Sequence, residues 1–328
     1  MTNKVRTDIL LSLALSAAML IGLGSCRKDP TNTSSSGIAT IVCDDGFENI
    51  MNQEIDVFEY NCKGNANIIP YYVPEKACVD SLLDLKTKTI VITRELTEKE
   101  KAYLESQKKH PRSNRIAVDA IALIVNPQNS VEILSISEIA DILTGRVTRW
   151  DEIEPSKLGE IQVVFDNEGS STVKYMRDSV MNGQQFGPNV YAQHSSAEVF
   201  RQVQMRKNAI GVIGVSWIST DMRTRDLSRE ERIQSLSQQD TTVTEFDTNV
   251  KVLKVRRDDS LRAFKPYQAY IYDGSYPLYR SIYMITTGVN GSLSHGFYSF
   301  VTGTLGQKII QRTGVLPARV QPRMVNLY

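Results

Sequence analysis

The chain has 328 residues, with 38 basic and 37 acidic side chains and a formal net charge of +1. This balance of charge argues against a nucleic-acid-binding surface or a polybasic membrane patch, and a hydrophobic content of 41% is typical of a globular protein. The length is enough for one large domain or for two lobes.

The first 26 residues predict a lipoprotein signal sequence. Lys4 and Arg6 precede an apolar run over 9–23, which at about 15 residues is too short to span the hydrocarbon core of a bilayer comfortably. The run ends in Leu-Gly-Ser-Cys, which resembles a bacterial lipobox. We therefore expect residues 1–25 to be removed and Cys26 to carry the lipid, palmitate included, that anchors the protein in the cell envelope, facing the periplasm or the cell surface. An ordinary secretory signal with Cys26 merely nearby is the alternative.

The next segment, 26–37, is polar and built of small residues without apolar periodicity. Such a composition predicts a flexible tether between membrane and folded protein, with an ordered arm as the alternative. The cysteines after Cys26 are Cys43, Cys62 and Cys78. An odd number in an oxidising compartment allows one disulfide and one free thiol. Cys62 and Cys78, which flank a turn-rich stretch, are the preferred pair, although the sequence does not decide the pairing.

From residue 38 on, short apolar β-branched runs alternate with segments of helical periodicity. The expected strands are 38–42, 66–72, 89–92, 120–125, 161–165, 210–217 and 281–286. The expected helices are 48–60, 75–85, one capped by Thr97 with Glu100, 137–143 ending at Gly145, 173–180, 197–205 and 296–311. This alternation predicts an α/β fold with largely parallel sheets. The polar stretch 221–247 reads as a surface insertion.

Motifs for catalysis or metal binding are absent. The chain has no HExxH, P-loop, GxSxG, CxxC or GxGxxG sequence, and the cysteine spacing matches no zinc site. His194 and Ser195 form the one adjacent pair that a hydrolase could use. We therefore expect a binding protein without catalysis, cofactor or metal.

The positive signal is a strand that feeds a short hydroxyl-rich turn at the start of a helix. Gly169 can take a positive φ, and Ser170, Ser171 and Thr172 bring hydroxyls and free N–H groups to the helix N-terminus. Such an end attracts anions. The alternative is that one of these residues only caps the helix.

Several separated segments occur in an order typical of one family. They are 119–127, 137–145 with 148–150, 169–172, 209–214, 276–280, 306–310 and 314–317. With these segments the chain resembles the phosphate-type periplasmic substrate-binding proteins of ABC transporters over nearly all of its mature part. The turn 169–172 lies where that family has a Gly-Ser-Gly-Thr anion loop.

The resemblance implies a type II fold of two α/β lobes joined by a hinge, with the ligand in the cleft between them. One lobe is expected from 38–118 and 276–328, and the other from 119–275. The implied function is a monomeric, lipid-anchored protein that captures an oxyanion, phosphate first, for ABC permease subunits. The alternative is the same fold acting as a sensor or interaction lipoprotein with another small polar ligand.

The resemblance also places the ligand on three loops. The expected ligand-binding residues are Gly46, Phe47, Thr93, Arg94, Asp166, Ser170, Ser171 and Thr172.

Two of these positions depart from the family pattern. Where the family commonly has an arginine before the loop serine, this chain has Asp166, and where it has an aspartate after a lobe-one strand, this chain has Thr93 beside Arg94. We hypothesise that the charges have changed lobes, with Arg94 as bidentate donor and Asp166 as acceptor that senses a ligand proton. In the alternative, Arg94 forms a surface ion pair and Asp166 caps the turn. Asp44 and Asp45 add negative charge that repels a dianion, by about 1 kcal/mol at ~4 Å in water and more in a drier cleft.

Overall fold

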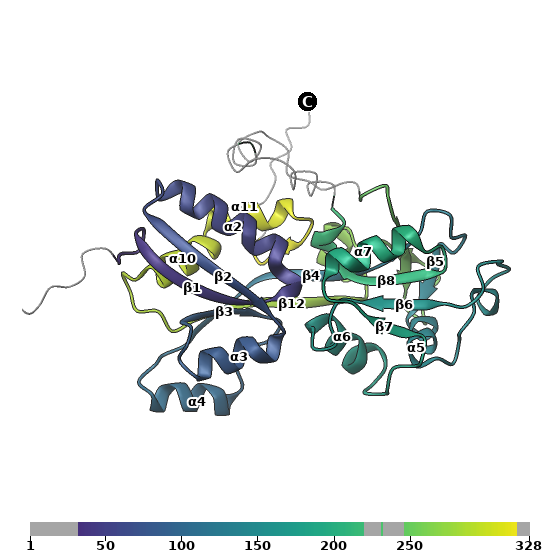
Figure 1. The fold of residues 1–328 in the computed structure, drawn as a ribbon, viewed down its shortest axis with the longest axis horizontal. Helices are drawn as coiled ribbons and strands as arrows, with labels where there is room; N and C mark the ends of the chain where they lie inside the picture. Colours follow the sequence, from purple (N-terminus) through teal and green to yellow (C-terminus); the bar gives the residue numbers. More distant parts are fainter. Residues whose placement is uncertain (1–31, 220–230, 232–245, 320–328) are drawn as a thin grey trace, which may run out of the picture.

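A computed structural model describes residues 32–219, 231 and 246–319. It confirms the α/β class: a sheet runs through two lobes, with helices on both of its faces (Figure 1). Within these residues, no helix is long and apolar enough to cross a membrane. The signal sequence, Cys26 and nearly all of the expected insertion lie outside the described residues.

The elements follow the predicted alternation. The strands are β1 (Gly37–Asp44), β2 (Ala66–Val73), β3 (Thr89–Ile92), β4 (Arg112–Val125), β5 (Ile133–Ser135), β6 (Gln162–Phe165), β7 (Val190–Ala192), β8 (Ala209–Gly214), β9 (Lys251–Val252), β10 (Lys254–Arg256), β11 (Ala263–Phe264), β12 (Tyr279–Thr286) and β13 (Leu316–Pro317). The helices are α2 (Glu48–Asn61), α3 (Glu75–Leu83), α4 (Glu98–Ser106), α5 (Ile136–Thr144), α6 (Ser171–Tyr175), α7 (Ser196–Met205), α9 (Gln268–Tyr272), α10 (Leu293–Val301) and α11 (Thr304–Arg312).

The main sheet has the strand order β2-β1-β3-β12-β4-β8-β6-β7. Its outer parts are parallel, but β12 is antiparallel to both β3 and β4, and β4 is antiparallel to β8. We call the part with β1, β2 and β3 lobe one and the part with β6, β7 and β8 lobe two. Strand β4 joins them, because 112–120 pair with β12 and 121–125 pair with β8. It therefore begins eight residues before the expected strand.

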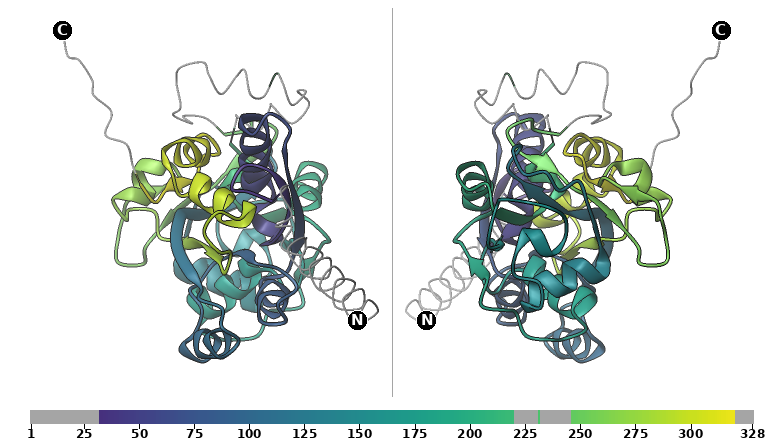
Figure 2. Two further views of the ribbon diagram at one scale, coloured as in Figure 1. Left: turned by 90° about the vertical axis from the view of Figure 1, so that its left-hand side faces the viewer. Right: turned by 90° about the vertical axis from the view of Figure 1, so that its right-hand side faces the viewer.

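The two ends of the described chain meet in lobe one. Helices α10 and α11 pack beside α2, and the end-on views show them together (Figure 2). Their apolar side chains cover one face of the sheet in a core that includes Phe47, Met51 and Phe297. A second cluster, with Cys78, Leu82 and Leu104, lies under α3 and α4.

Local signals in the sequence set several helix ends as expected. Thr97 and Glu100 form a reciprocal capping box at the start of α4. Helix α5 ends at Gly145, whose φ of 76° is the left-handed conformation that favours glycine.

Two further expected elements were wrong in their extent. The single helix over 296–311 is two helices, because α10 ends before Gly303 and the chain turns into α11. There Gly306 lies so close to the preceding helix that a Cβ would fall 2.6 Å from the Phe300 carbonyl oxygen. The expected strand over 210–217 stops at Gly214 and continues as a 3₁₀ turn.

The disulfide that the cysteine count allows is not formed, because Cys43, Cys62 and Cys78 are free. Cys62 packs on the core under α2, whereas Cys78 belongs to the cluster under α3. The sheet separates these two clusters, so the preferred pair cannot meet.

Residues 33–36, which belong to the expected tether over 26–37, already make defined contacts. The Thr33 and Ser36 hydroxyls are hydrogen-bonded at 2.8 Å. A Cβ on Gly296 of α10 would lie 1.8 Å from the Ser34 carbonyl oxygen, so the backbone there is packed against that helix. Residues 33–36 therefore form an ordered arm on lobe one.

Candidate functional site

The two lobes touch across the expected cleft. Asp44, at the end of β1, accepts a hydrogen bond from the Ser171 hydroxyl of lobe two at 2.8 Å. The Trp217 indole N–H donates to the Gly46 carbonyl oxygen at 3.3 Å. The first bond joins the first and third predicted loops, and the second joins the first loop to the 3₁₀ turn after β8. The structure therefore has a closed cleft.

Gly169 contributes to this closure in a way the sequence did not predict. Its φ is not in the positive range. Instead, a Cβ there would lie 3.2 Å from the Pro74 side chain of lobe one. The glycine thus permits a close approach between the lobes rather than a special turn.

The first loop is a 3₁₀ turn over Asp45–Phe47, capped by Asp44, which accepts the Gly46 N–H at 3.1 Å. A Cβ on Gly46 would lie 3.0 Å from Asp44 Oδ1 and 3.2 Å from the Arg280 guanidinium. Phe47 is fully buried, and the Arg280 guanidinium lies over its ring at 5.0 Å. Both predicted residues of this loop therefore contact the centre of the cleft.

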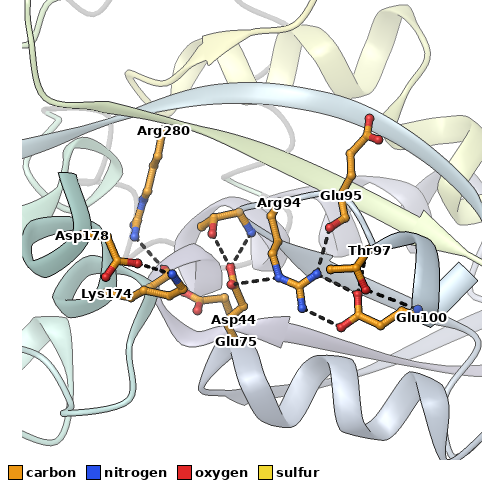
Figure 3. A network of polar contacts seen from close by, with 11 residues as sticks. Asp44, Glu75, Arg94, Glu95, Thr97, Glu100, Lys174, Asp178 and Arg280 are labelled. Carbon is orange, nitrogen blue, oxygen red and sulfur yellow. Dashed lines mark hydrogen bonds and ion pairs between the residues drawn. The ribbon is translucent and has the colours of Figure 1, made fainter. Parts of the chain in front are cut away.

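That centre is occupied by Arg280 of β12, which sequence reasoning did not assign to the site. Its Nη2 lies 3.0 Å from Oδ2 of Asp119, its register partner on β4. Its Nη1 donates to the hydroxyls of Ser171, at 2.6 Å, and Thr172, at 3.1 Å. Figure 3 shows the side chain reaching from its strand into this network. One buried guanidinium therefore connects the strands between the lobes to the third loop.

The third loop keeps its predicted cap and adds a carboxylate. Ser170 accepts the Val173 N–H at 3.1 Å as the N-cap of α6 and donates its hydroxyl to Asp166 at 2.5 Å. Ser170 is thus engaged inside its own loop, whereas Ser171 and Thr172 face Arg280. All of these side chains are buried.

The second loop is turned towards lobe one. The Thr93 N–H donates to Glu75 at 2.8 Å, and its hydroxyl bonds the same oxygen. Arg94 gives Nη1 and Nη2 to the two oxygens of Glu100, each at 2.8 Å (Figure 3). Its Nε lies 3.8 Å from Glu75. This is the ion pair of the alternative interpretation. It occupies the two guanidinium nitrogens that the hypothesis of exchanged charges, called the exchange hypothesis below, assigned to the ligand.

The charges of the cleft are unequal. Asp44, Asp119 and Asp166 are buried and Asp45 is half-buried, around the guanidinium of Arg280. Burial raises the pKa of Asp44 to about 7 although Arg280 opposes it, and burial together with the neighbouring Asp166 raises that of Asp45 to about 6. Burial likewise raises the pKa of Asp166 to about 6. Around Arg280, the described residues therefore place more carboxyl groups than this guanidinium can neutralise.

Three buried carboxylate oxygens of the cleft have no hydrogen-bond donor among the described residues. They are Oδ2 of Asp44, Oδ1 of Asp45 and Oδ1 of Asp119. A cavity of about 450 Å³ opens beside Ser171 and Arg280, between α3 and α6. Its walls carry both signs of charge, with Glu75 and Arg94 on lobe one and Lys174 and Asp178 on lobe two. A polar solute can reach the Arg280 network from this side.

The pair that a hydrolase could have used serves a helix. Ser195 is the N-cap of α7 and accepts the Glu198 N–H at 3.3 Å, while the His194 N–H donates to the Glu198 carboxylate at 3.0 Å. These contacts give both residues a structural role at the start of α7.

A signal for Arg280 was present in its strand. Arg280, Ile282 and Met284 alternate on one side of β12, and all three are buried. An arginine in phase with buried apolar residues predicts a buried cation with a carboxylate partner. Asp119, one residue before an apolar run, is the matching signal on β4.

Two α/β lobes, crossed by two strands and closed over a polar cleft, define the fold of the periplasmic binding proteins. Residues 30–304 match the family model of the PBP superfamily domain. The chain belongs to the PBP superfamily.

The curated relatives share low sequence identity with the chain or match only a short part of it. The phosphate-binding protein PstS of Pseudomonas aeruginosa PAO1 is 22% identical over 232 residues, a match that covers 66% of this chain and 63% of the relative. The chain thus spans less than two thirds of that relative's length. The phosphate-binding protein PstS 2 of Streptococcus pneumoniae TIGR4 is 36% identical over 64 residues, which is 20% of each chain.

Solved structures agree with the fold. A phosphate ABC transporter substrate-binding protein from Clostridium perfringens, with bound phosphate, aligns with a TM-score of 0.68 and 21% identity over 86% of this chain and 100% of that one. An ABC-type phosphate transport receptor from Vibrio cholerae aligns with a TM-score of 0.60 and 18% identity over the same shares. At these identities the likeness defines the fold.

Proposed function

We propose that this protein is a lipid-anchored, extracytoplasmic substrate-binding protein. It captures an inorganic oxyanion, phosphate first, between its lobes and delivers it to the permease of an ABC importer. It acts as a monomer, without catalysis. Two findings support this proposal: the chain belongs to the PBP superfamily, and the relatives it resembles are named as phosphate-binding proteins.

The observation that carries the proposal is the buried Arg280 at the meeting point of both lobes. Its Nη1 faces the hydroxyls of Ser171 and Thr172, and the Gly46 N–H lies on the opposite loop. A guanidinium with convergent hydroxyl and amide donors is the chemistry that recognises a tetrahedral oxyanion. We therefore assign the clamp to Arg280 in place of Arg94, and keep Gly46, Phe47, Ser170, Ser171 and Thr172 as ligand-loop residues.

The direct test is thermal unfolding of the mature protein with phosphate, arsenate, sulfate or chloride at matched ionic strength. A ligand at about 1,000 times its Kd adds roughly 4 kcal/mol to the free energy of unfolding, which raises Tm by several degrees. Stabilisation by phosphate and arsenate supports the proposal. Equal responses to all four salts contradict it.

One observation favours a second candidate. The carboxylate excess around Arg280 and the mixed charges of the 450 Å³ cavity suit a ligand that also donates hydrogen bonds. The protein is then a sensor or interaction lipoprotein of the same fold, with another small polar solute. Stabilisation by such a solute at millimolar concentration, with none by any oxyanion, selects this candidate.

A further inference from the structure

Asp44 already receives the hydrogen bonds that a bound oxyanion needs. Its Oδ1 accepts the Gly46 N–H of lobe one at 3.1 Å and the Ser171 hydroxyl of lobe two at 2.8 Å. Both donors are on the loops assigned to the ligand. One carboxylate oxygen thus bridges the lobes as an oxygen of a bound anion would.

The surroundings of Asp44 make this position costly for a charged group. The side chain is fully buried, and Oδ2 has no donor among the described residues. Arg280 is the cation that faces it, and Arg280 is shared with Asp119. The other titratable groups that interact with it are acids, which are neutral with their proton and negative without it. They are Cys43 on β1, Asp45 beside it, Glu75 and Cys78 on α3, and Asp166 after β6.

We propose that Asp44 limits the affinity of the cleft for anions by acting as a built-in occupant of the anion position. A ligand oxyanion enters only when the Asp44 carboxylate has left its two donors or has taken up a proton. This inference rests on the proposed capture of an oxyanion and names the residue that limits it.

The proton link follows from the same geometry. An ionised Asp44 and an incoming anion compete for Arg280, Gly46 and Ser171 and repel each other. A protonated Asp44 does not repel the anion, and its hydroxyl can donate to it. Burial raises the pKa of Asp44 to about 7, so the competing carboxylate is formed within the physiological range of pH. Phosphate affinity should therefore fall as pH rises through neutrality.

The experiment measures phosphate binding by calorimetry at pH 5.5 and pH 8.5, with the wild-type mature protein and Asp44→Asn. Asparagine keeps one acceptor oxygen and places a donor where Oδ2 lies. Phosphate itself takes up a proton near neutral pH, so only the difference between the two proteins counts. Asp84→Asn, which removes an exposed carboxylate paired with Lys86, is the matched control.

We expect Asp44→Asn to bind phosphate about tenfold more tightly than wild type at pH 8.5 and about equally at pH 5.5. Asp84→Asn should follow wild type at both values. Equal or weaker binding by Asp44→Asn at pH 8.5 overturns the inference and leaves the proposed function intact. Absence of phosphate binding by every variant at both pH values overturns the proposed function as well.

A second variant keeps the inference testable if Asp44→Asn does not fold. If thermal unfolding shows that Asp44→Asn is not folded, Asp44→Ala removes both carboxylate oxygens and should show the same gain at pH 8.5. A folded Asp44→Ala with wild-type affinity contradicts the inference.

Discussion

Arg280 and Asp119 form a buried ion pair at matched positions of neighbouring antiparallel strands. Arg280 Nη2 lies 3.0 Å from Asp119 Oδ2, and the two side chains are 3% and 1% exposed. Gly214 of β8 leaves room for the carboxylate, because a Cβ there would lie 3.1 Å from it. The pair holds the guanidinium with Nη1 aimed at the third loop. Removing one partner would leave an uncompensated buried charge.

Arg280→Lys tests the clamp without removing its charge. Lysine cannot bond Asp119 and the Ser171 and Thr172 hydroxyls at the same time, because it lacks the planar fork. We expect phosphate affinity to fall at least tenfold, about 1.4 kcal/mol, in a protein that remains folded by circular dichroism. Titration calorimetry measures the change.

Arg94→Lys is the matched control for the clamp. The fork of Arg94 is bound to Glu100, and this contact lowers the pKa of Glu100 to about 2. We expect phosphate affinity within about twofold of wild type and a slightly lower Tm. The reverse pattern, with a large loss at Arg94 and none at Arg280, would restore the exchange hypothesis.

Stability should decrease as pH rises through the acid side of neutrality. The pKa of Asp44 is about 7 in the folded protein, above its usual value of 3.8. A carboxyl with a raised folded pKa stabilises the fold below its unfolded pKa, and that contribution is lost as pH rises through the folded value. Asp45 and Asp166 act in the same direction. We expect Tm to be several degrees lower at pH 8 than at pH 5.5 without ligand.

Asp44→Asn should reduce this difference by about half, and Asp84→Asn should leave it unchanged. Differential scanning calorimetry gives both values. A wild-type Tm that rises between pH 5.5 and pH 8 would contradict the buried-carboxylate account of the cleft.

The cysteines give a chemical test of the fold. Cys43 and Cys78 are buried on different elements and Cys62 is partly exposed at the end of α2. We expect three free thiols per Cys26→Ala molecule after denaturation without reductant, measured with a chromogenic disulfide. In the native protein Cys62 should react first, since burial keeps the pKa of the Cys43 thiol high. Recovery of one thiol would indicate a disulfide.

The anchor is tested by Cys26→Ser in a bacterial host. Without the lipidation cysteine, the protein should move from the detergent phase to the aqueous phase in a detergent phase-partition assay. Cys62→Ser changes the same residue type at a folded position and should stay in the detergent phase. Equal partition of both variants would favour the ordinary secretory signal.

The sequence by itself determined the local elements and their order. Helix periodicity, the Thr97 capping box and the Gly145 helix end depend on residues within a few positions of one another, so they can be read along the chain. The alternation of strands and helices defined the fold class. The hydroxyl turn of 169–172 was found in the same way.

Only the tertiary structure decided which charges meet. Asp44, Asp119, Asp166 and Arg280 lie far apart in the chain and come together because β12 returns between β3 and β4 and the cleft closes over its end. The same packing pairs Arg94 with Glu100 and places Cys62 and Cys78 on opposite faces of the sheet. Strand order and register are long-range properties set by the packing of the whole core, and no local pattern encodes which distant carboxylate a buried arginine will face.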